Sequence, residues 1–393
     1  MISFALDQEQ ELIQSTVREF ARAEVRPRLR AWEKAREVEV GARRKFHELG
    51  LALVDVPEAL GGGGASALTA ALVHEELAWG DAGAAVALWT PSLAAAALVE
   101  LGGPEQARRW IAKLDGAESF GALAWSEKGG PIAGFSTVAE RNGDGWTLHG
   151  KKCFVTNGAN AHVTVVLAQI AGERDGWDGV GAFVVGAGAA GMRAGDRHAT
   201  LGLESVHASE VILEGVHVPD EDRLRVEDFP AALRRLLERA SLLTAARQVG
   251  LARAAYEVAL DYTQDRKAFG KPVAHFQSIA FTLADMLMDV ESARWMVWRA
   301  AVALEGKTRS PLIAAAAVHA NEAAWRVADN AVQLLGGAGY CQDFPVEKWL
   351  RDTKTLALVG PPSELSQLHV ASHELGHTVG EELPSGALQP MLT

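Results

Sequence analysis

The sequence changes its periodicity twice, and these two changes restrict the fold more than any other feature. Apolar residues recur at helical spacing over residues 1–118, give way to short strand-like runs over residues 119–225, and return to helical spacing over residues 226–378. Residues 379–393 form a tail with glycine and proline that we expect to be frayed. This order predicts an α+β chain, mostly α, with an N-terminal helical domain, a central antiparallel β-domain and a C-terminal antiparallel helical bundle.

Turn and cap residues mark boundaries within these segments. Asp7 is a plausible N-cap for the first helix. Four glycines at residues 61–64 could suggest a phosphate loop, but no Gly-Lys-Ser/Thr follows them, so a connecting loop is the better interpretation. Residues 142–145 (NGDG) predict a tight turn. The runs expected to form strands are residues 146–148, 163–167, 182–185 and 209–213.

Composition argues against several classes of protein. Hydrophobic residues make up 48% of the 393 residues, yet no uninterrupted apolar segment reaches ~18 residues, which indicates a soluble protein and not a membrane protein. A formal net charge of −12 without a long basic run argues against nucleic-acid binding. The N-terminus lacks the features of a secretory signal, so we expect a cytoplasmic protein. Cys153 and Cys341 are far apart in the sequence, and each is expected to be a buried free thiol.

Three short runs combine aromatic, basic and glycine residues in a fixed order along the chain. They are residues 152–158 (KCFVTNG), 266–272 (RKAFGKP) and 333–337 (QLLGG). An aromatic face can stack on a flavin ring, a guanidinium binds phosphate with a fixed geometry, and glycines let backbone N–H groups approach oxygen atoms. Together the three runs resemble the flavin-site signatures of the acyl-CoA dehydrogenase family.

The resemblance covers nearly the whole chain. Further matches follow in the family's order at residues 7–10, 57–58, 61–62, 201–202, 216–219 and 351–352. The resemblance implies that the C-terminal domain is a four-helix bundle and that the cofactor is FAD. It also implies an oligomer, either a dimer or a homotetramer built as a dimer of dimers, that acts on an acyl thioester.

The same resemblance assigns cofactor-binding roles to individual residues. Phe154, Val155 and Thr156 match the aromatic-x-Thr element that relatives present to the flavin ring. Ser126 begins a loop that contacts flavin or thioester in relatives, although residues 128–134 are shorter here and lack the usual Ser-Asp pair. The residues expected to hold the FAD diphosphate and adenine across a subunit interface are Arg266, Phe269, Gln277, Gln333, Gly336 and Gly337.

The catalytic base of the family is missing from both of its known positions. Gly360 stands where relatives carry the catalytic glutamate, and Ala240 stands where some relatives carry it instead. Ser241 replaces an arginine that is common near the CoA pantetheine. Glu238 is a candidate only through proximity, because two residues along a helix turn it roughly 200° away from Ala240. The sequence therefore leaves the catalytic residue unassigned.

Three further positions bear on the same site. Glu204 replaces a usual arginine, and Pro362 replaces a hydroxyl residue near the flavin. Glu364 is interpreted as a structural or flavin-side residue. The pattern indicates that the end of the site that holds the flavin is kept, and that the end that activates the thioester is rebuilt.

Two look-alike motifs suggest other functions. Residues 186–191 (GAGAAG) match a dinucleotide-binding fingerprint, but the residues after them are poor helix starters, so a glycine-rich loop of the β-domain is the better interpretation. Residues 373–377 (HELGH) match a zinc-binding string, but Leu383 occupies the place of a third histidine. We interpret that string as a coincidence and expect no metal.

Four functions are consistent with this sequence. The leading one is an FAD-dependent enzyme that oxidises an acyl thioester, on CoA or a carrier protein, at its α,β carbons, with electron-transfer flavoprotein as a possible acceptor. The main alternative is a catalytically silent subunit of a heteromer with a homologous chain. A flavin oxidase or monooxygenase of the same superfamily is the third. A zinc hydrolase built on His373 and His377 is the fourth.

Overall fold

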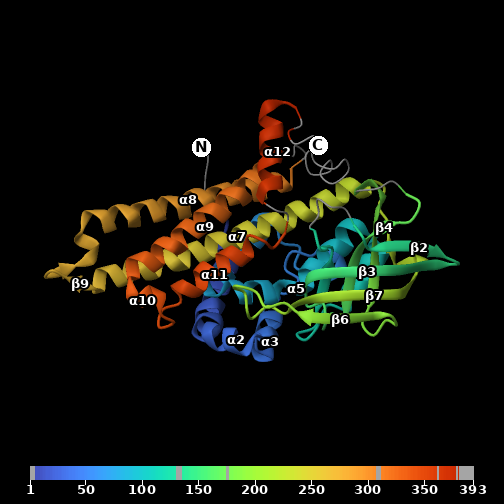
Figure 1. The fold of residues 1–393 in the computed structure, drawn as a ribbon, viewed down its shortest axis with the longest axis horizontal. Helices are drawn as coiled ribbons and strands as arrows, with labels where there is room; N and C mark the ends of the chain where they lie inside the picture. The colour runs from blue at the N-terminus through green and yellow to red at the C-terminus, as the bar shows by residue number, and fades with distance from the viewer. Residues whose placement is uncertain are drawn as a thin grey trace.

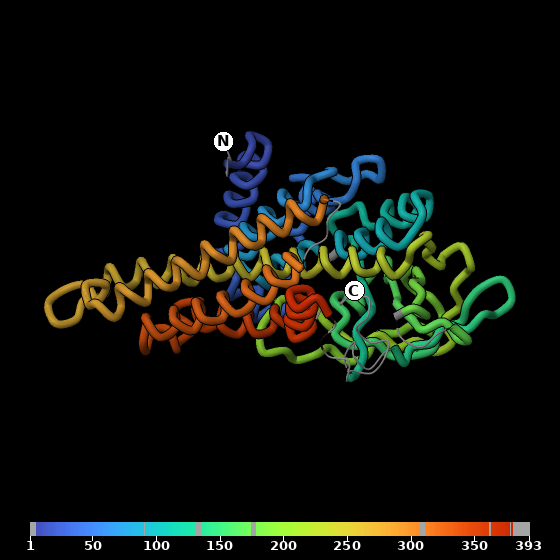
Figure 2. Tube along the Cα trace, turned by 90° about the horizontal axis from the view of Figure 1, so that it is seen from above, coloured from blue at the N-terminus to red at the C-terminus, as the bar shows by residue number. Residues whose placement is uncertain are grey.

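A computed structural model describes residues 5–129, 135–173, 177–306, 311–360, 363–377 and 379. The chain forms an elongated molecule with a β-domain at one end and a long helical hairpin at the other (Figure 1). The N-terminal helices pack beside the middle of the molecule (Figures 1 and 2). The predicted fold class, helical domain, β-domain and helical bundle, is confirmed. Of the predicted tail, all but Val379 lies outside the described residues.

The N-terminal segment is helical because its caps and apolar faces agree. Asp7 caps the first helix as predicted: the Gln10 backbone N–H donates to Asp7 Oδ1 at 2.8 Å, and the Gln10 side chain closes a capping box. The loop predicted at residues 61–64 is present after a short 3-10 turn. The helices are α1 (Gln8–Phe20), α2 (Leu29–Ala35), α3 (Val40–Glu48), α4 (Ala67–Gly80), α5 (Ala82–Leu101) and α6 (Pro104–Ile111), with a π-type turn at Ala21–Val25 and 3-10 turns at Arg26–Arg28 and Glu58–Leu60.

Helix α5 bends in its middle at Pro91. A proline inside a helix has no N–H to donate to the carbonyl four residues earlier, here Ala87. The Arg43 side chain supplies a donor, because its Nη1 lies 3.1 Å from that carbonyl oxygen. The bend is therefore stabilised from outside the helix. No single helix among the described residues is long and apolar enough to cross a membrane, and only the two halves of bent α5, which is mostly buried, pass that test together.

The central sheet is mixed. Its strand order is β6-β7-β3-β2-β4-β5-β8, with β1 paired to β4. Most pairs are antiparallel, but β1–β4 and β2–β4 are parallel, which the sequence did not predict. The turn expected at residues 142–145 joins β2 to β3 through Gly143 and Asp144. The strands are β1 (Gly121–Ala124), β2 (Val138–Asn142), β3 (Gly145–Thr156), β4 (Val163–Ile170), β5 (Val180–Gly186), β6 (Met192–Arg197), β7 (Ala208–Pro219) and β8 (Arg223–Leu224).

The C-terminal bundle is built around one very long helix, α7 (Phe229–Asp265), which runs the length of the molecule in Figure 1. Small side chains let α7, α8 and α9 approach closely; the buried ones include Ala245, Ala246, Ala293, Ala300, Ala316, Ala320 and Ala323. The other elements are β9 (Lys267–Ala268), β10 (Lys271–Pro272), α8 (Gln277–Leu304), α9 (Leu312–Leu335), α10 (Gly337–Tyr340), α11 (Val346–Leu356) and α12 (Ser363–Leu375).

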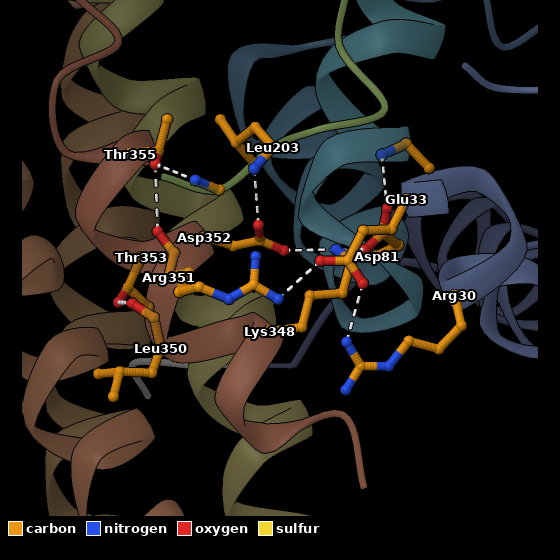
Figure 3. Close-up of polar contacts among 12 residues, drawn as sticks. Arg30, Glu33, Asp81, Leu203, Lys348, Leu350, Arg351, Asp352, Thr353 and Thr355 are labelled. Atoms are coloured by element: carbon orange, nitrogen blue, oxygen red, sulfur yellow. Dashed lines mark hydrogen bonds and ion pairs between the residues drawn. The ribbon is translucent and has the colours of Figure 1, made fainter. Parts of the chain in front are cut away.

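A buried ion network joins the three parts of the chain (Figure 3). Lys348 on α11 contacts Asp81, which caps α5, and its Nζ lies 2.5 Å from Asp352 Oδ2. Asp352 Oδ1 accepts the backbone N–H of Leu203, in the loop between β6 and β7, at 2.7 Å. The adjacent Gly202 packs so closely that an added Cβ would lie 2.5 Å from the Arg351 carbonyl carbon. The network fixes α11, and therefore the start of the segment that carries Gly360.

The two cysteines differ from the prediction. Both are free, but Cys341 is exposed and Cys153 is partly exposed, so the expectation of two buried thiols is wrong. Cys341 follows the short helix α10 at the surface, and Cys153 lies at an irregularity of β3.

Candidate functional site

The end of β3 presents an exposed aromatic ring. The pairing of β3 with β7 is irregular between Lys152 and Val155, and Phe154 adopts a positive φ of 52°. A non-glycine residue in this region is strained, and such strain often occurs at functional sites. The Phe154 side chain is 59% exposed, whereas Val155 is buried and anchors the strand, and Thr156 is half-buried beside them. The strained backbone thus turns a large apolar ring toward solvent.

His198 supports Phe154 from behind. The two rings stack with centroids 4.2 Å apart and an interplanar angle of 25°. The Phe154 backbone N–H also donates to His198 Nε2 at 3.1 Å. Nε2 accepts this hydrogen bond, so the neutral imidazole carries its proton on Nδ1. His198 therefore fixes both the ring and the backbone of Phe154.

A buried ion pair lies beside the contact between Ser126 and the strand that carries Phe154. Lys152 Nζ lies 2.5 Å from Glu127 Oε1, and the Cys153 backbone N–H donates to the Ser126 carbonyl at 2.9 Å. Burial alone would raise the pKa of Glu127, but the charge and hydrogen bond of Lys152, with hydrogen bonds from residues 136–137, lower that pKa to about 2. Burial lowers the pKa of Lys152 to about 8, against the attraction of Glu127. The pair brings Ser126 and the Phe154 strand together.

A second group of predicted residues lies at the tip of the α7–α8 hairpin. Arg266 ends α7, Gln277 begins α8, and both side chains are exposed. Between them the β9–β10 turn places Phe269 at a positive φ of 51°, with its side chain 96% exposed. No contact within the described residues accounts for so exposed a phenylalanine beyond its edge-on packing on Phe276.

Gln333, Gly336 and Gly337 lie near this tip, at the end of α9. Gly336 has φ 59° and ψ −132°, which disfavours residues with a side chain. An added Cβ at Gly336 or Gly337 meets no atom within 4 Å among the described residues. Gln333 is exposed on the last turn of α9. The turn therefore offers open backbone and one amide side chain to a ligand.

The two groups lie far apart along the molecule. In both Figure 1 and Figure 2 the α7–α8 tip and α10 are at the far end of the long axis from β3. One chain therefore brings Ser126 together with Phe154 to Thr156, and separately brings Arg266, Phe269 and Gln277 to the end where α9 meets α10. It does not bring these two groups together.

The family's base positions carry no acidic side chain. Gly360 follows α11 with φ 109°, and an added Cβ there meets no atom of the described residues within 4 Å. Ala240 is half-buried on α7. Space for a carboxylate exists at Gly360, but the group itself is absent.

A small pocket lies where α7, α9 and α12 meet. Its lining includes Glu238, Ser241 and His369, together with Leu365 and Ser366 of α12. Glu238 and Ser241 are three residues apart, so they share one face of α7. The pocket thus brings together the Glu238 carboxylate and the His369 imidazole. Its lining also includes Ser241, the residue next to Ala240.

The remaining predicted positions are structural or lie outside the description. Glu204 forms an ion pair with Arg36 at 3.1 Å. Glu364 is exposed in the first turn of α12. Pro362 and residues 130–134 lie outside the described residues.

Neither look-alike motif has the surroundings its function would need. Residues 186–191 lead from β5 into strand β6 and not into a helix. Helix α12 ends at Leu375, so His377 lies beyond the helix that would align it with His373. No group of three or more possible metal ligands occurs in the described part of the chain.

Sequence reasoning missed several polar residues. They are the half-buried His198 that supports Phe154, the buried Lys152–Glu127 pair, and a buried arginine on α7, Arg247. A signal existed for the last, because Arg247 interrupts an otherwise small and apolar stretch of a buried helix. Nothing in the local sequence indicated the partners of His198.

An exposed aromatic ring such as that of Phe154 can stack on an aromatic cofactor, and an open turn such as that at Gly336 lets backbone N–H groups approach phosphate oxygens. The fold is that of a class of flavin-dependent dehydrogenases. Family models for the acyl-CoA dehydrogenase N-terminal, middle and C-terminal domains match residues 7–117, 122–216 and 229–375. The chain belongs to the acyl-CoA dehydrogenase family, which confirms the predicted family and oxidoreductase class.

Individual relatives agree with this assignment. Short-chain specific acyl-CoA dehydrogenase from Rattus norvegicus is 33% identical over 381 residues, covering 95% of this chain and 92% of the relative. Butyryl-CoA dehydrogenase from Megasphaera elsdenii has a TM-score of 0.88 and 29% identity, covering 95% of this chain and all of the other. A glutaryl-CoA dehydrogenase from Mycobacterium smegmatis, solved in complex with FADH2, shares the fold with a TM-score of 0.89 at 24% identity, covering 96% and 97%.

Proposed function

We propose that the chain is a flavin-dependent dehydrogenase that oxidises an acyl thioester between its α and β carbons. FAD, when bound, accepts the hydride from the β carbon. The observation that carries the proposal is the presence of two exposed surfaces that lie far apart along the chain's long axis. One is the Phe154 strand, and the other is the α7–α8 tip with the adjoining Gly336 turn.

The first surface would receive the flavin ring. The exposed face of Phe154 can stack on it, and Thr156 can offer a hydroxyl to its polar edge. Ser126, held by the Lys152–Glu127 pair, borders the same position. His198 and the ion pair keep these groups in place before the cofactor binds.

The second surface would receive the diphosphate and adenine of a cofactor bound to another copy of the chain. Arg266 supplies a planar, fixed set of donors for phosphate. Gln277 and Gln333 supply amides, Phe269 an aromatic face, and the Gly336 turn open backbone. Because the two surfaces do not meet within one chain, we propose that a complete site needs two chains, in a dimer or a dimer of dimers.

Glu238 is proposed as the candidate proton acceptor to be tested, although it is turned roughly 200° from Ala240 around α7. Among the described residues that line the α7–α9–α12 pocket, it is the carboxylate. The pocket is bordered by Ser241, beside the alternative base position, and by α12, which follows Gly360. A positioned general base accelerates proton abstraction by ~10²–10⁴.

The proposal is tested by anaerobic titration of the FAD-loaded protein with acyl-CoAs, following the visible absorbance of oxidised flavin. Bleaching by the wild type, and bleaching that is slower by ~10²–10⁴ in Glu238→Gln, is the expected result. His369→Gln is the matched variant on the opposite wall and should slow the reaction less. Bleaching at the wild-type rate in Glu238→Gln would remove Glu238 from this role.

A silent partner subunit is the second candidate, favoured by the absence of a carboxylate at Gly360 and Ala240. If the chain is a silent subunit, the wild type should bind FAD and acyl-CoA, but acyl-CoA should not bleach the flavin absorbance. Gly360→Glu distinguishes the two functions, since the site has room for the side chain. The positive φ would cost about 1–3 kcal/mol of stability. Bleaching only after this substitution would support the silent subunit and contradict the leading proposal.

A further inference from the structure

An arginine on α7 is buried without a matching acceptor. Arg247 is 1% exposed, and its guanidinium carbon lies 4.4 Å from the ring centroid of Trp89 on α5. His74 on α4 packs edge-on against the same ring, with centroids 5.0 Å apart. Three helices therefore converge on one polar cluster within apolar surroundings that include Leu243.

Several donors of this cluster have no partner. Arg247 Nε and Nη2, Trp89 Nε1 and His74 Nδ1 are buried without a hydrogen bond among the described residues. A guanidinium that stacks through its face keeps its N–H edge free to bind an oxygen pair. Each unmet buried donor costs about 1–3 kcal/mol, and more when it is charged. The cluster is therefore costly unless a ligand completes it.

The charge of the cluster is unbalanced. The nearest carboxylate that acts on Arg247 is Asp55, but Asp55 Oδ2 lies 3.0 Å from Arg239 Nη2, which also donates to the Asp55 carbonyl. Burial, with the positive charges of Arg247 and Arg239, holds the pKa of His74 well below its usual range, so His74 is neutral. Two guanidinium groups thus share one carboxylate, which leaves one positive charge unpaired.

The cluster lies on the face of α7 that carries Ala240, which is the opposite face from Glu238. Arg247 is seven residues after Ala240, so both lie on one face of α7, ~10 Å apart along its axis. The next residue, Gln248, donates to the carbonyl of Thr353 on α11, the helix that leads to Gly360. An extended chain advances ~3.5 Å per three bonds, so an acyl chain of on the order of eight bonds spans this distance.

We propose that Arg247 and Trp89 form the far end of the acyl-binding site and bind a carboxylate at the end of the acyl chain. This inference rests on the proposed dehydrogenase function, with the thioester near Ala240 and Gly360, and it does not use Glu238, which lies on the opposite face of α7. The substrate class is then an ω-carboxyacyl thioester and not a plain fatty acyl thioester. Trp89 Nε1 supplies a second donor to the same group.

Calorimetric binding of matched ligands to the FAD-loaded oligomer tests this inference without requiring turnover. Straight-chain acyl-CoAs are compared with ω-carboxyacyl-CoAs of the same length. The wild type should bind one of the carboxylated esters tighter than its plain counterpart by about tenfold or more, the effect of one charge-assisted hydrogen bond. Arg247→Met should abolish the preference. Arg235→Met, a change on the same helix that removes a partly exposed ion pair with Glu100 of α5, should keep it.

Equal wild-type affinity for the two series at every length, or binding of neither, would overturn the inference whether or not Arg247→Met folds. A structural role for Arg247 predicts a lower melting temperature in Arg247→Met, whereas a ligand-binding role predicts an unchanged or higher one, because an unpaired buried charge has been removed. Carboxylate preference without flavin bleaching would keep this inference and remove the dehydrogenase proposal. Flavin bleaching by plain esters that Arg247→Met does not affect would keep the dehydrogenase proposal and remove this inference.

Discussion

At the scale of single residues, the candidate site depends on side chains that hold other side chains. Phe154 faces solvent because His198 and the β3 irregularity hold it there, and Ser126 stays beside it because Glu127 is paired with Lys152. The residues that would touch the cofactor therefore depend on a buried layer beneath them. The contribution of that buried layer can be tested by measuring the stability of variants.

Breaking the buried pair should cost more than removing it. Lys152→Met leaves the Glu127 carboxylate buried without a countercharge and should lower the free energy of unfolding by ~3–5 kcal/mol. The double variant Glu127→Gln/Lys152→Met should recover most of this loss. Urea unfolding measures both. A double variant as unstable as Lys152→Met would mean that the lysine stem, and not the charge, is what the fold needs.

The same pair should give stability a pH dependence with two signs. The pKa of Glu127 is lowered to about 2, so its contribution is present above the ordinary glutamate pKa of ~4.3 and is lost as the pH falls from there toward 2. The pKa of Lys152 is lowered to about 8, so the unfolded state holds more protons between pH 8 and ~10.4, and stability rises with pH there. The difference in the free energy of unfolding between the wild type and the double variant, measured across pH, should show both slopes. A difference that does not change with pH would contradict the role given to this ion pair.

At the scale of elements, the exposed face of α8 is the feature that the isolated chain leaves unexplained. Large apolar side chains recur every seven residues along it and are exposed: Phe281, Met288, Trp295 and Val302. Residues seven apart drift by only ~20° around a straight helix, so they form one stripe. An apolar stripe of this kind indicates packing against another helix, and we expect it to be α8 of a second copy.

Charge placed on this stripe should separate the copies. Met288→Lys/Trp295→Glu is expected to convert the oligomer to monomers and to reduce FAD content, because a complete site needs two chains. Light scattering after size exclusion gives the mass, and circular dichroism checks that the fold is kept. Thr282→Lys, a change at a partly exposed position of the same helix outside the stripe, is the control. An intact oligomer in the double variant would place the interface elsewhere.

Elements were predictable from sequence where local chemistry determines them. The Asp7 capping box and the two-residue turn at Gly143 and Asp144 depend on neighbouring residues, and both were predicted. The parallel pairing of β1 and β2 with β4 was not, because it joins segments that are distant in the sequence. The positive φ of Phe154 and the unpaired donors of Arg247 also depend on distant neighbours, so periodicity and motifs carried no signal for them.

At the scale of the whole molecule, the arrangement separates the two cofactor-binding surfaces along the longest axis (Figures 1 and 2). The ion network around Lys348 fixes the N-terminal helices, the β-domain and α11 relative to each other (Figure 3). The two surfaces therefore do not meet within one chain. The central claim is therefore that one FAD site is made from two copies.

Complementation between two defective variants tests this claim most directly. Phe154→Ala/Thr156→Val damages the ring surface, and Arg266→Glu damages the phosphate surface at the other end. Each variant purified alone should contain little FAD, whereas oligomers assembled from a mixture should regain FAD, because some of their sites combine two intact surfaces. Mixed oligomers that bind no more FAD than either variant alone, or wild-type monomers that bind FAD fully, would contradict the account.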